Sequence, residues 1–268
     1  MQPIICTTLA MTICRNCGYL MSFLHWGVCF YSDFPSGKSE IIPLISQGHK
    51  SNFRGEKMEQ QTGIIVEHVY KSFGKEHVLK DVNLTIPPGR IFGVVGNNGS
   101  GKTVLMKCIC GFMKADSGNI VVNGQRVGRD CDFPDRLGVI IETPGFLPNL
   151  SGFKNLKILA SLKARIGKEE IIKTLEQVGL NPKMRKPVSK YSLGMRQRLG
   201  IAQAIMEDPG VLILDEPFNG LDKAGAAQMR ELLKDLKKQG KAILLASHNA
   251  QDIEELCDDV HEMEDKWK

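Results

Sequence analysis

Short apolar runs and longer stretches of helical spacing alternate along the chain from residue 64 onward. Alternating apolar and polar residues predict a strand with one buried face. An uninterrupted apolar run between turn residues predicts a strand that is buried on both faces. The predicted strands are 64–70, 78–86, 91–95, 119–122, 137–141, 211–215 and 242–247.

Helical spacing fills most of the intervals between the later strands. Apolar residues three or four positions apart follow residue 103, recur through 149–204, and give the stretch from Met229 to Leu236 one apolar face. Strands that alternate with helices are typical of α/β proteins, in which helices cover both faces of a parallel sheet. The sequence therefore predicts an α/β fold with an inserted helical subdomain at about 145–205.

The first 57 residues carry neither period, and the composition changes sharply at Met58. Residues 54–57, Arg-Gly-Glu-Lys, can be encoded by AGA-GGA-GAA-AAA, a purine-rich sequence suited to ribosome binding ahead of an ATG for Met58. One hypothesis is that residues 1–57 are an irregular leader that is not translated in vivo, with a working domain at 58–268. A membrane-tethering or regulatory arm is the alternative.

Composition narrows the range of partners. The chain has 35 Lys and Arg residues against 30 Asp and Glu residues, a net charge of +5, which is too mild to predict a nucleic-acid-binding surface. The most apolar run, residues 18–31, is shorter than the roughly 20 residues of a membrane-spanning helix, so we expect membrane contact only through a partner. Cys14 and Cys17 could form half of a zinc site, but without a second close pair we favour free thiols in a reducing compartment.

The stretch from Arg90 to Thr103 joins a short apolar strand, a glycine-rich turn and the start of a helix. Its spacing, G-x-x-x-x-G-K-T, is typical of a loop whose backbone N–H groups surround phosphate oxygens at a helix N-terminus. Lys102 would reach the β- and γ-phosphates, and Thr103 would offer its hydroxyl to Mg²⁺. The predicted phosphate-binding residues are Gly96, Asn97, Asn98, Gly99, Ser100, Gly101, Lys102 and Thr103.

Two carboxylates and a histidine follow later apolar strands. Asp215 and Glu216 end the strand 211–215, at the edge where α/β sheets place their ligands. We expect Asp215 to hold Mg²⁺ and Glu216 to accept a proton from an attacking water. His248 follows the strand 242–247 and should contact the γ-phosphate at the same edge.

Together with residues 190–202, these motifs resemble the ATP-binding cassette (ABC) ATPases, in the family's order and spacing over about residues 62–262. The resemblance implies a P-loop NTPase fold with a mostly parallel core sheet, N-terminal antiparallel strands and the inserted helical subdomain. It also implies that the chain binds ATP and Mg²⁺ and hydrolyses the nucleotide.

The resemblance assigns roles to further residues. It implies that Phe73 stacks on adenine, that Ser192 and Gly194 act as a signature on the ATP of an opposite subunit, and that Asp222 belongs to a D-loop across the dimer. His248 becomes the switch histidine, and the 96–103 and 215–216 motifs become Walker A and Walker B. The signature departs from the family pattern, since it reads Y-S-L-G-M.

Glu142 stands where the family carries a glutamine that contacts Mg²⁺ and the attacking water. The resemblance therefore places Glu142 among both the catalytic and the metal-contacting residues. Its carboxylate adds negative charge beside the triphosphate, Asp215 and Glu216, so we expect it to be tolerated only while Mg²⁺ is bound.

The stretch 140–156 is similar to ABC ATPases of bacterial lantibiotic-immunity and bacitracin-resistance exporters. This similarity implies an ATP-hydrolysing subunit at the cytoplasmic face of the membrane, working as a homodimer or heterodimer on a separate permease, with a role in antimicrobial resistance or bacteriocin immunity. The alternatives are a soluble ABC switch protein and a weakly active regulatory cassette.

Overall fold

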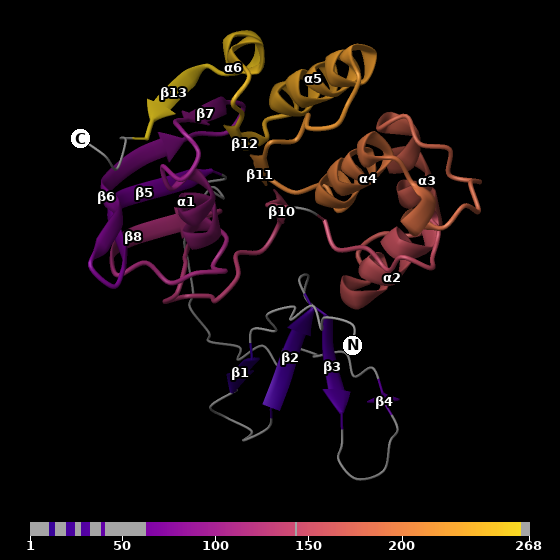
Figure 1. Ribbon diagram of the computed structural model, residues 1–268, viewed down its shortest axis with the longest axis horizontal. Helices are drawn as coiled ribbons and strands as arrows, with labels where there is room; N and C mark the ends of the chain where they lie inside the picture. The colour runs from indigo at the N-terminus through magenta and orange to yellow at the C-terminus, as the bar shows by residue number, and fades with distance from the viewer. Residues whose placement is uncertain are drawn as a thin grey trace, which may run out of the picture. The chain divides into compact units, whose positions relative to one another are not determined.

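The computed structural model describes residues 11–13, 20–24, 28–32, 39–40, 63–142 and 144–263 (Figure 1). The chain divides into two compact units, Met1–Glu56 and Lys57–Lys268. The described part of the first unit is a sheet of antiparallel strands, and these are β1 (Met11–Ile13), β2 (Leu20–Leu24), β3 (Val28–Ser32) and β4 (Ser39–Glu40). The rest of the predicted leader, including Cys14 and Cys17, lies outside the described residues.

A parallel sheet forms the centre of the second unit. Its order is β10 (Leu137–Ile140), β11 (Val211–Asp215), β12 (Ala242–Ala246), β7 (Ile91–Val95) and β13 (Asp259–Glu262). All four strand pairs are parallel, so every strand ends at the same edge of the sheet. The three central strands are apolar except for Asp215 at the end of β11, as expected of parallel strands that are covered on both faces.

The second sheet is antiparallel and has the order β6 (Glu76–Ile86), β5 (Ile64–Phe73), β8 (Ser117–Val122) and β9 (Gln125–Arg126). Helix α1 (Lys102–Ile109) contacts β6 and β8 of this sheet and β11 of the parallel sheet. Its side chains Leu105, Met106 and Ile109 are fully buried. The predicted antiparallel strands beside a mostly parallel core are confirmed.

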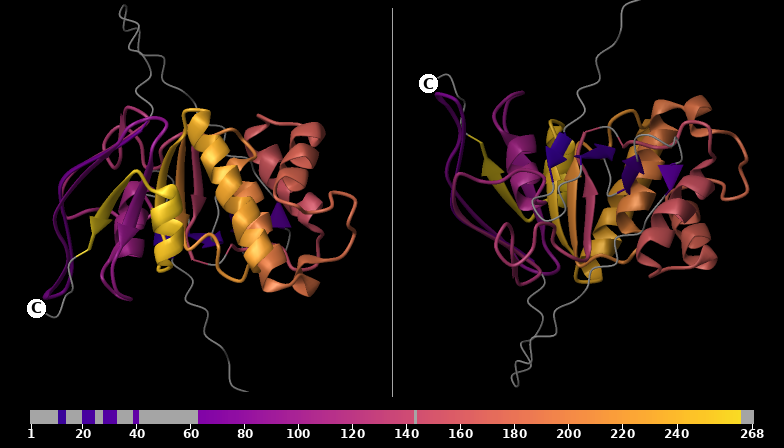
Figure 2. Two further views of the ribbon diagram at one scale, coloured as in Figure 1. Left: turned by 90° about the horizontal axis from the view of Figure 1, so that it is seen from above. Right: turned by 90° about the horizontal axis from the view of Figure 1, so that it is seen from below.

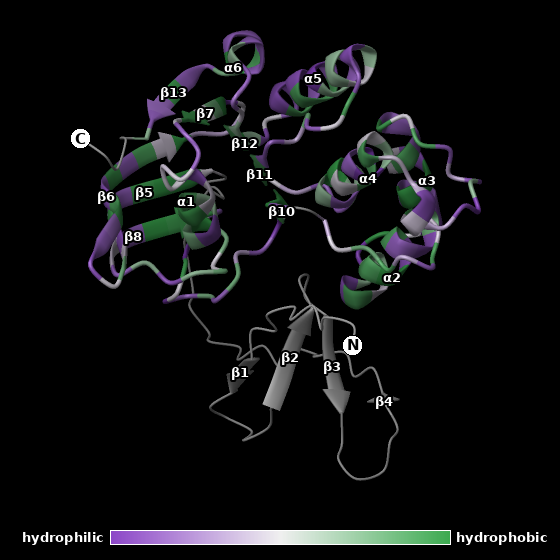
Figure 3. Cartoon of the chain, in the orientation of Figure 1, coloured by the Kyte–Doolittle hydropathy of each residue, from purple (hydrophilic) through white to green (hydrophobic). Residues whose placement is uncertain are grey.

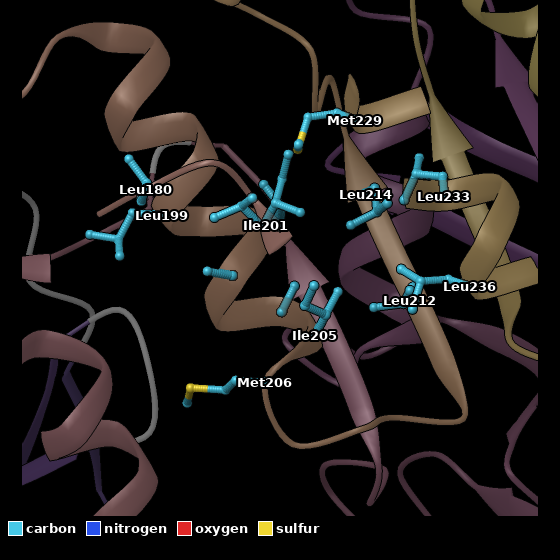
Figure 4. Close-up of a cluster of buried hydrophobic side chains, with 14 of the residues drawn as sticks. Leu180, Leu199, Ile201, Ile205, Met206, Leu212, Leu214, Met229, Leu233 and Leu236 are labelled. Carbon is cyan, nitrogen blue, oxygen red and sulfur yellow. The ribbon is translucent and has the colours of Figure 1, made fainter. Parts of the chain in front are cut away.

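Helices cover the other side of the parallel sheet, where α5 (Lys223–Lys238) and α6 (Ala250–Leu256) lie (Figure 2). The helical insertion consists of α2 (Gly152–Lys163), α3 (Lys168–Gln177), the 3₁₀ turn η1 (Val188–Lys190) and α4 (Leu193–Ile205). Figure 4 shows how one buried apolar cluster joins α4, β11 and α5. The inserted helical subdomain is therefore held by the same core as the sheet.

The sequence analysis missed β9, α6 and β13 of the second unit, and it predicted no strand where β1–β4 lie. Strand β13 has a single aliphatic residue, Val260, which is itself exposed, and the strand is hydrophilic in Figure 3 whereas β8 is hydrophobic. It is an edge strand that pairs with β7 through its backbone, so its side chains carry no burial pattern. In the described ranges no helix is long and apolar enough to span a membrane.

The packing of α5 on the sheet gives a stability prediction. Leu233 is 1% exposed in the core, whereas the adjacent Leu232 only borders it. Leu233→Ala should lower the free energy of unfolding by about 3 kcal/mol, because it leaves a cavity that the neighbouring strands cannot fill. Leu232→Ala is the matched control and should cost about 1 kcal/mol. Urea titration of both variants measures the difference, and equal losses would contradict this packing.

Candidate functional site

The phosphate loop runs from the end of β7 to the first residue of α1. Gly96 and Gly101 have φ values of 147° and 105°, which only glycine adopts without strain. A Cβ on Gly101 would lie 3.0 Å from Val78 Cγ1, and one on Gly96 would lie 2.7 Å from Ser100 Oγ. The loop therefore folds tightly onto itself and onto β6, and it delivers Lys102 and Thr103 to the first turn of α1.

Two polar groups of this loop fit a bound phosphate. The Lys102 ammonium donates to the carbonyl oxygens of Gly96, at 2.6 Å, and Asn97, at 3.0 Å. Lys102 is only 9% exposed, yet no carboxylate among the described residues forms an ion pair with it. The Ser100 hydroxyl is buried without any hydrogen-bond partner in this part of the chain. A buried cation and a buried hydroxyl of this kind call for an oxyanion, which a triphosphate supplies.

The predicted magnesium ligands meet at the end of β11. The Thr103 hydroxyl donates to Asp215 Oδ2 at 2.8 Å, although the two residues are far apart in sequence. Burial raises the pKa of the Asp215 carboxyl, and the Thr103 hydrogen bond and the Lys102 charge act in the opposite direction. A hydroxyl and a carboxylate are the hard oxygen donors that Mg²⁺ binds beside a phosphate, so the pair fits this ion.

Glu216 and His248 form the predicted catalytic pair. His248 Nδ1 lies 2.8 Å from Glu216 Oε2, and Gln197 Nε2 donates to the Glu216 carbonyl oxygen at 3.2 Å. Glu216 has φ 49°, in the left-handed region that a side chain other than glycine rarely adopts. Such a conformation costs on the order of 1 kcal/mol and persists where the surroundings fix it, as they do at many functional sites.

Glu142 lies two residues beyond the end of β10 and also has a left-handed φ, 59°. Its Oε1 accepts a hydrogen bond from Lys107 Nζ of α1 at 2.5 Å, and the two form an ion pair. Lys107 thus supplies a cation beside the Glu142 carboxylate, while the expectation that this carboxylate is tolerated only with Mg²⁺ bound stays a prediction. Sequence reasoning missed this partner because it lies 35 residues away and belongs to no motif.

One cleft of about 720 Å³ brings most of these groups together. Its volume suits a nucleotide. Phe73 lines it with a ring that is 47% exposed and therefore free to stack on a planar ligand. The other predicted site residues along this cleft are Asn98, Gly99, Gly101, Lys102, Thr103, Glu142, Asp215 and Glu216. His248 lines an adjoining hollow of about 950 Å³, which also includes Gly96, Asn97 and Glu216.

Within the described residues, Ser192, Gly194 and Asp222 line neither hollow, although Leu193, which lies between the first two, lines the cleft. Ser192 caps the N-terminus of α4 by accepting a hydrogen bond from Met195 N at 3.2 Å, and Asp222 caps α5 in the same way. A Cβ on Gly194 would lie 2.7 Å from the carbonyl oxygen of Gly220. The two cap segments therefore pack backbone to backbone, and Ser192 and Asp222 have no contact with the Walker A loop of their own chain among the interactions described.

A glycine loop between a parallel strand and a helix, with a hydroxyl and a carboxylate poised for a metal, defines a P-loop nucleotide-binding protein. The family model of the ABC transporter matches residues 79–219. The chain belongs to this family, and its fold is that of an ABC ATPase cassette.

Relatives and solved structures agree with this assignment. The chain is 43% identical over 197 residues to the bacitracin transport ATP-binding protein BcrA of Enterococcus faecalis, covering 73% of this chain and 64% of that protein. It is 38% identical over 193 residues to the lantibiotic transport ATP-binding protein SrtF of Streptococcus pyogenes, covering 72% and 83%. An ATP-binding subunit of an ABC transporter of known structure has a TM-score of 0.68 and 27% identity, covering 75% of this chain and 86% of its own.

Another relative is an uncharacterized ABC transporter ATP-binding protein, YdbJ of Bacillus subtilis, at 42% identity over 199 residues, which are 73% of this chain and 64% of YdbJ. The chain thus spans 64% of the length of YdbJ and BcrA. A dimeric cassette, MJ0796, bound to ADP and Pi, has a TM-score of 0.68 at 22% identity, covering 75% of this chain and 94% of its own. At that identity the likeness concerns the fold.

The unpartnered Ser100 hydroxyl predicts opposite effects of its removal on stability and on ATP affinity. Ser100→Ala should leave the thermal stability of the nucleotide-free protein unchanged or slightly higher, because it removes a buried unsatisfied group. It should weaken ATP binding by about fivefold, because one phosphate contact is lost. Thermal melts without nucleotide and equilibrium titration with ATP check the two effects. A variant that loses stability and keeps its affinity would refute a phosphate-facing hydroxyl.

Proposed function

We propose that this chain binds and hydrolyses ATP as the nucleotide-binding subunit of an ABC exporter, and that it drives a separate membrane permease. The observation that carries the proposal is the meeting of Lys102, the Thr103–Asp215 pair and Glu216 on one nucleotide-sized cleft. Two separate segments of sequence supply these groups: residues 102–103 begin the helix after β7, and residues 215–216 lie at the carboxyl end of β11. Their convergence supports a phosphoryl-transfer site.

The groups divide the work of hydrolysis. Lys102 exchanges its two carbonyl partners for the β- and γ-phosphates, and the N–H groups at the start of α1 bind further phosphate oxygens. Thr103 and Asp215 would hold Mg²⁺, which neutralises charge on the β- and γ-phosphates when it is bound. Glu216 takes the proton of the attacking water, and His248 orients Glu216 and contacts the γ-phosphate.

Dimerisation follows from the position of the signature. Ser192 and Gly194 make no described contact with the Walker A loop of their own chain, and Leu193 between them lines the cleft as a 56% exposed apolar residue. An exposed apolar side chain at a helix N-terminus is explained if this surface meets another cassette. We infer a homodimer, or a heterodimer with a sister subunit, in which Ser192, Gly194 and Asp222 act on the nucleotide of the opposite subunit. The dimeric MJ0796 cassette supports this arrangement at the level of the fold.

The cargo is inferred from relatives rather than from the site. BcrA and SrtF are named for bacitracin and lantibiotic transport, and the chain resembles both at about 40% identity. We propose export of, or self-immunity to, an antimicrobial peptide of this kind, with the subunit bound peripherally at the cytoplasmic face through its permease. Co-expression with a candidate ABC permease tests the proposal: this subunit should fractionate with the membrane and raise peptide tolerance. A subunit that stays in the soluble fraction would favour the soluble ABC switch.

The roles of Lys102 and Glu216 predict opposite defects. Glu216→Gln should lower kcat by about 100-fold or more while ATP still binds, because only proton acceptance is lost. It should accumulate a nucleotide-bound dimer, visible by size-exclusion chromatography. Lys102→Ala should instead weaken ATP binding by about 10- to 100-fold, because a charged phosphate contact disappears. A Glu216→Gln variant with wild-type kcat would refute the assignment, and a wild type without ATPase activity would favour the regulatory cassette.

The Lys107–Glu142 pair sharpens the expectation for Glu142. Glu142→Gln should bind nucleotide more tightly in EDTA, because it removes a negative charge and frees the Lys107 ammonium near the phosphates. Lys107→Met should bind more weakly for the opposite reason. Each change should be about fivefold, since the pair is partly exposed.

The double variant is the control for this pair. Lys107→Met with Glu142→Gln removes one charge of each sign, so its affinity in EDTA should fall within about twofold of wild type. Equal affinities for wild type and both single variants would show that the pair does not act on the nucleotide. Repeating the titration with Mg²⁺ should shrink all the differences, because the metal screens the carboxylate.

A further inference from the structure

Three buried polar side chains form a connected group next to His248. Ser247, the residue before it, is 4% exposed, Asp252 of α6 is 2% exposed, and Arg230 of α5 is 8% exposed. None of these residues belongs to a predicted motif. Charged side chains are rarely buried so completely unless they are paired and hydrogen-bonded, so their contacts show what they hold in place.

The two oxygens of Asp252 have different partners. Oδ1 accepts a hydrogen bond from Arg230 Nε at 2.8 Å and lies 2.7 Å from Arg230 Nη2. Oδ2 accepts a hydrogen bond from the Ser247 hydroxyl at 2.8 Å. Asp252 therefore joins α5 to the end of β12, with a charge-assisted bond on one side and a hydroxyl on the other.

Ser247 passes this connection to both sides of His248. Its Oγ donates to Asp252 and also accepts a hydrogen bond from the backbone N–H of Asn249 at 3.2 Å. The residues before and after His248 are therefore tied to one hydroxyl oxygen. The His248 side chain is itself 66% exposed, and its one described hydrogen bond is the contact with Glu216. The fixed backbone is what directs this exposed ring toward Glu216.

Arg230 also contacts the segment that carries Glu216. Its guanidinium carbon lies 5.9 Å from the ring centroid of Phe218, which is two residues beyond Glu216 and only 9% exposed. The two segments that carry Glu216 and His248 thus rest on one side chain. A buried ion pair often contributes little net stability, because the cost of desolvation offsets the attraction between the charges. The Arg230–Asp252 pair therefore matters more for the segments that it positions than for stability.

We propose that Asp252, clamped by Arg230, is a positioning residue for ATP hydrolysis that acts through Ser247 to hold His248 against Glu216. Asp252 touches neither the nucleotide cleft nor the catalytic carboxylate, so its effect is on kcat and not on ATP affinity. This inference rests on the proposed role of His248 in hydrolysis.

A double-mutant cycle tests the inference with a mild substitution. Ser247→Ala removes one hydroxyl and should lower kcat by about tenfold, with ATP affinity within twofold of wild type. His248→Ala should lower kcat by about 100-fold. In the His248→Ala background, Ser247→Ala should cause no further loss, because Ser247 then has no ring to position. Asp252→Asn should give the same pattern as Ser247→Ala, and its melting temperature reports whether it folds.

Lys237→Met is the matched control. Lys237 also lies on α5 and forms an ion pair with Asp258 at 2.5 Å, beyond the end of α6 and without any described contact to Ser247. Its kcat should equal that of wild type. A Ser247→Ala variant with wild-type kcat, or one whose loss multiplies that of His248→Ala, would overturn the positioning role. An unchanged kcat in His248→Ala would instead refute the proposed role of His248, and this inference with it.

Discussion

The parallel pairing of β7, β11 and β12 is the constraint on which the site depends. The backbone pairing holds these strands in register, so Gly93, Leu245 and Leu214 fall at the same level of the sheet. The residues that come next, the phosphate loop, Asp215 with Glu216, and Ser247 with His248, therefore share one edge. Because most residues of the three strands are buried, the edge cannot shift without disturbing the core that Figure 4 shows.

Two acidic residues of that edge have a left-handed backbone conformation. Glu142 and Glu216 both follow a parallel strand and both have φ near 50° to 60°. The turn redirects each side chain out of the strand and into the cleft, where each finds a basic partner, Lys107 or His248. The core and the helical insertion together supply the stability that keeps these conformations populated.

The sequence could predict what is local or repeated. The apolar strands, the G-x-x-x-x-G-K-T loop and the Asp215–Glu216 pair each show their nature within a few residues, and the relative order of the elements then implies the sheet. It could not predict β13, whose pairing is made by the backbone. It also could not predict the Lys107–Glu142 and Arg230–Asp252 pairs, since each joins residues from different elements and a lone charged residue on a helix usually faces solvent.

The distribution of polar groups in the cleft bears on selectivity. Lys102, the start of α1 and the Thr103–Asp215 pair line one part of the cleft, whereas the predicted contact for the base is the face of Phe73. Every nucleobase has such a face, and a stacking ring reads none of the hydrogen-bonding edges that separate adenine from guanine. A cassette built in this way recognises the triphosphate and accepts any base. The cellular excess of ATP over other nucleoside triphosphates, and not the pocket, would then determine which nucleotide is hydrolysed.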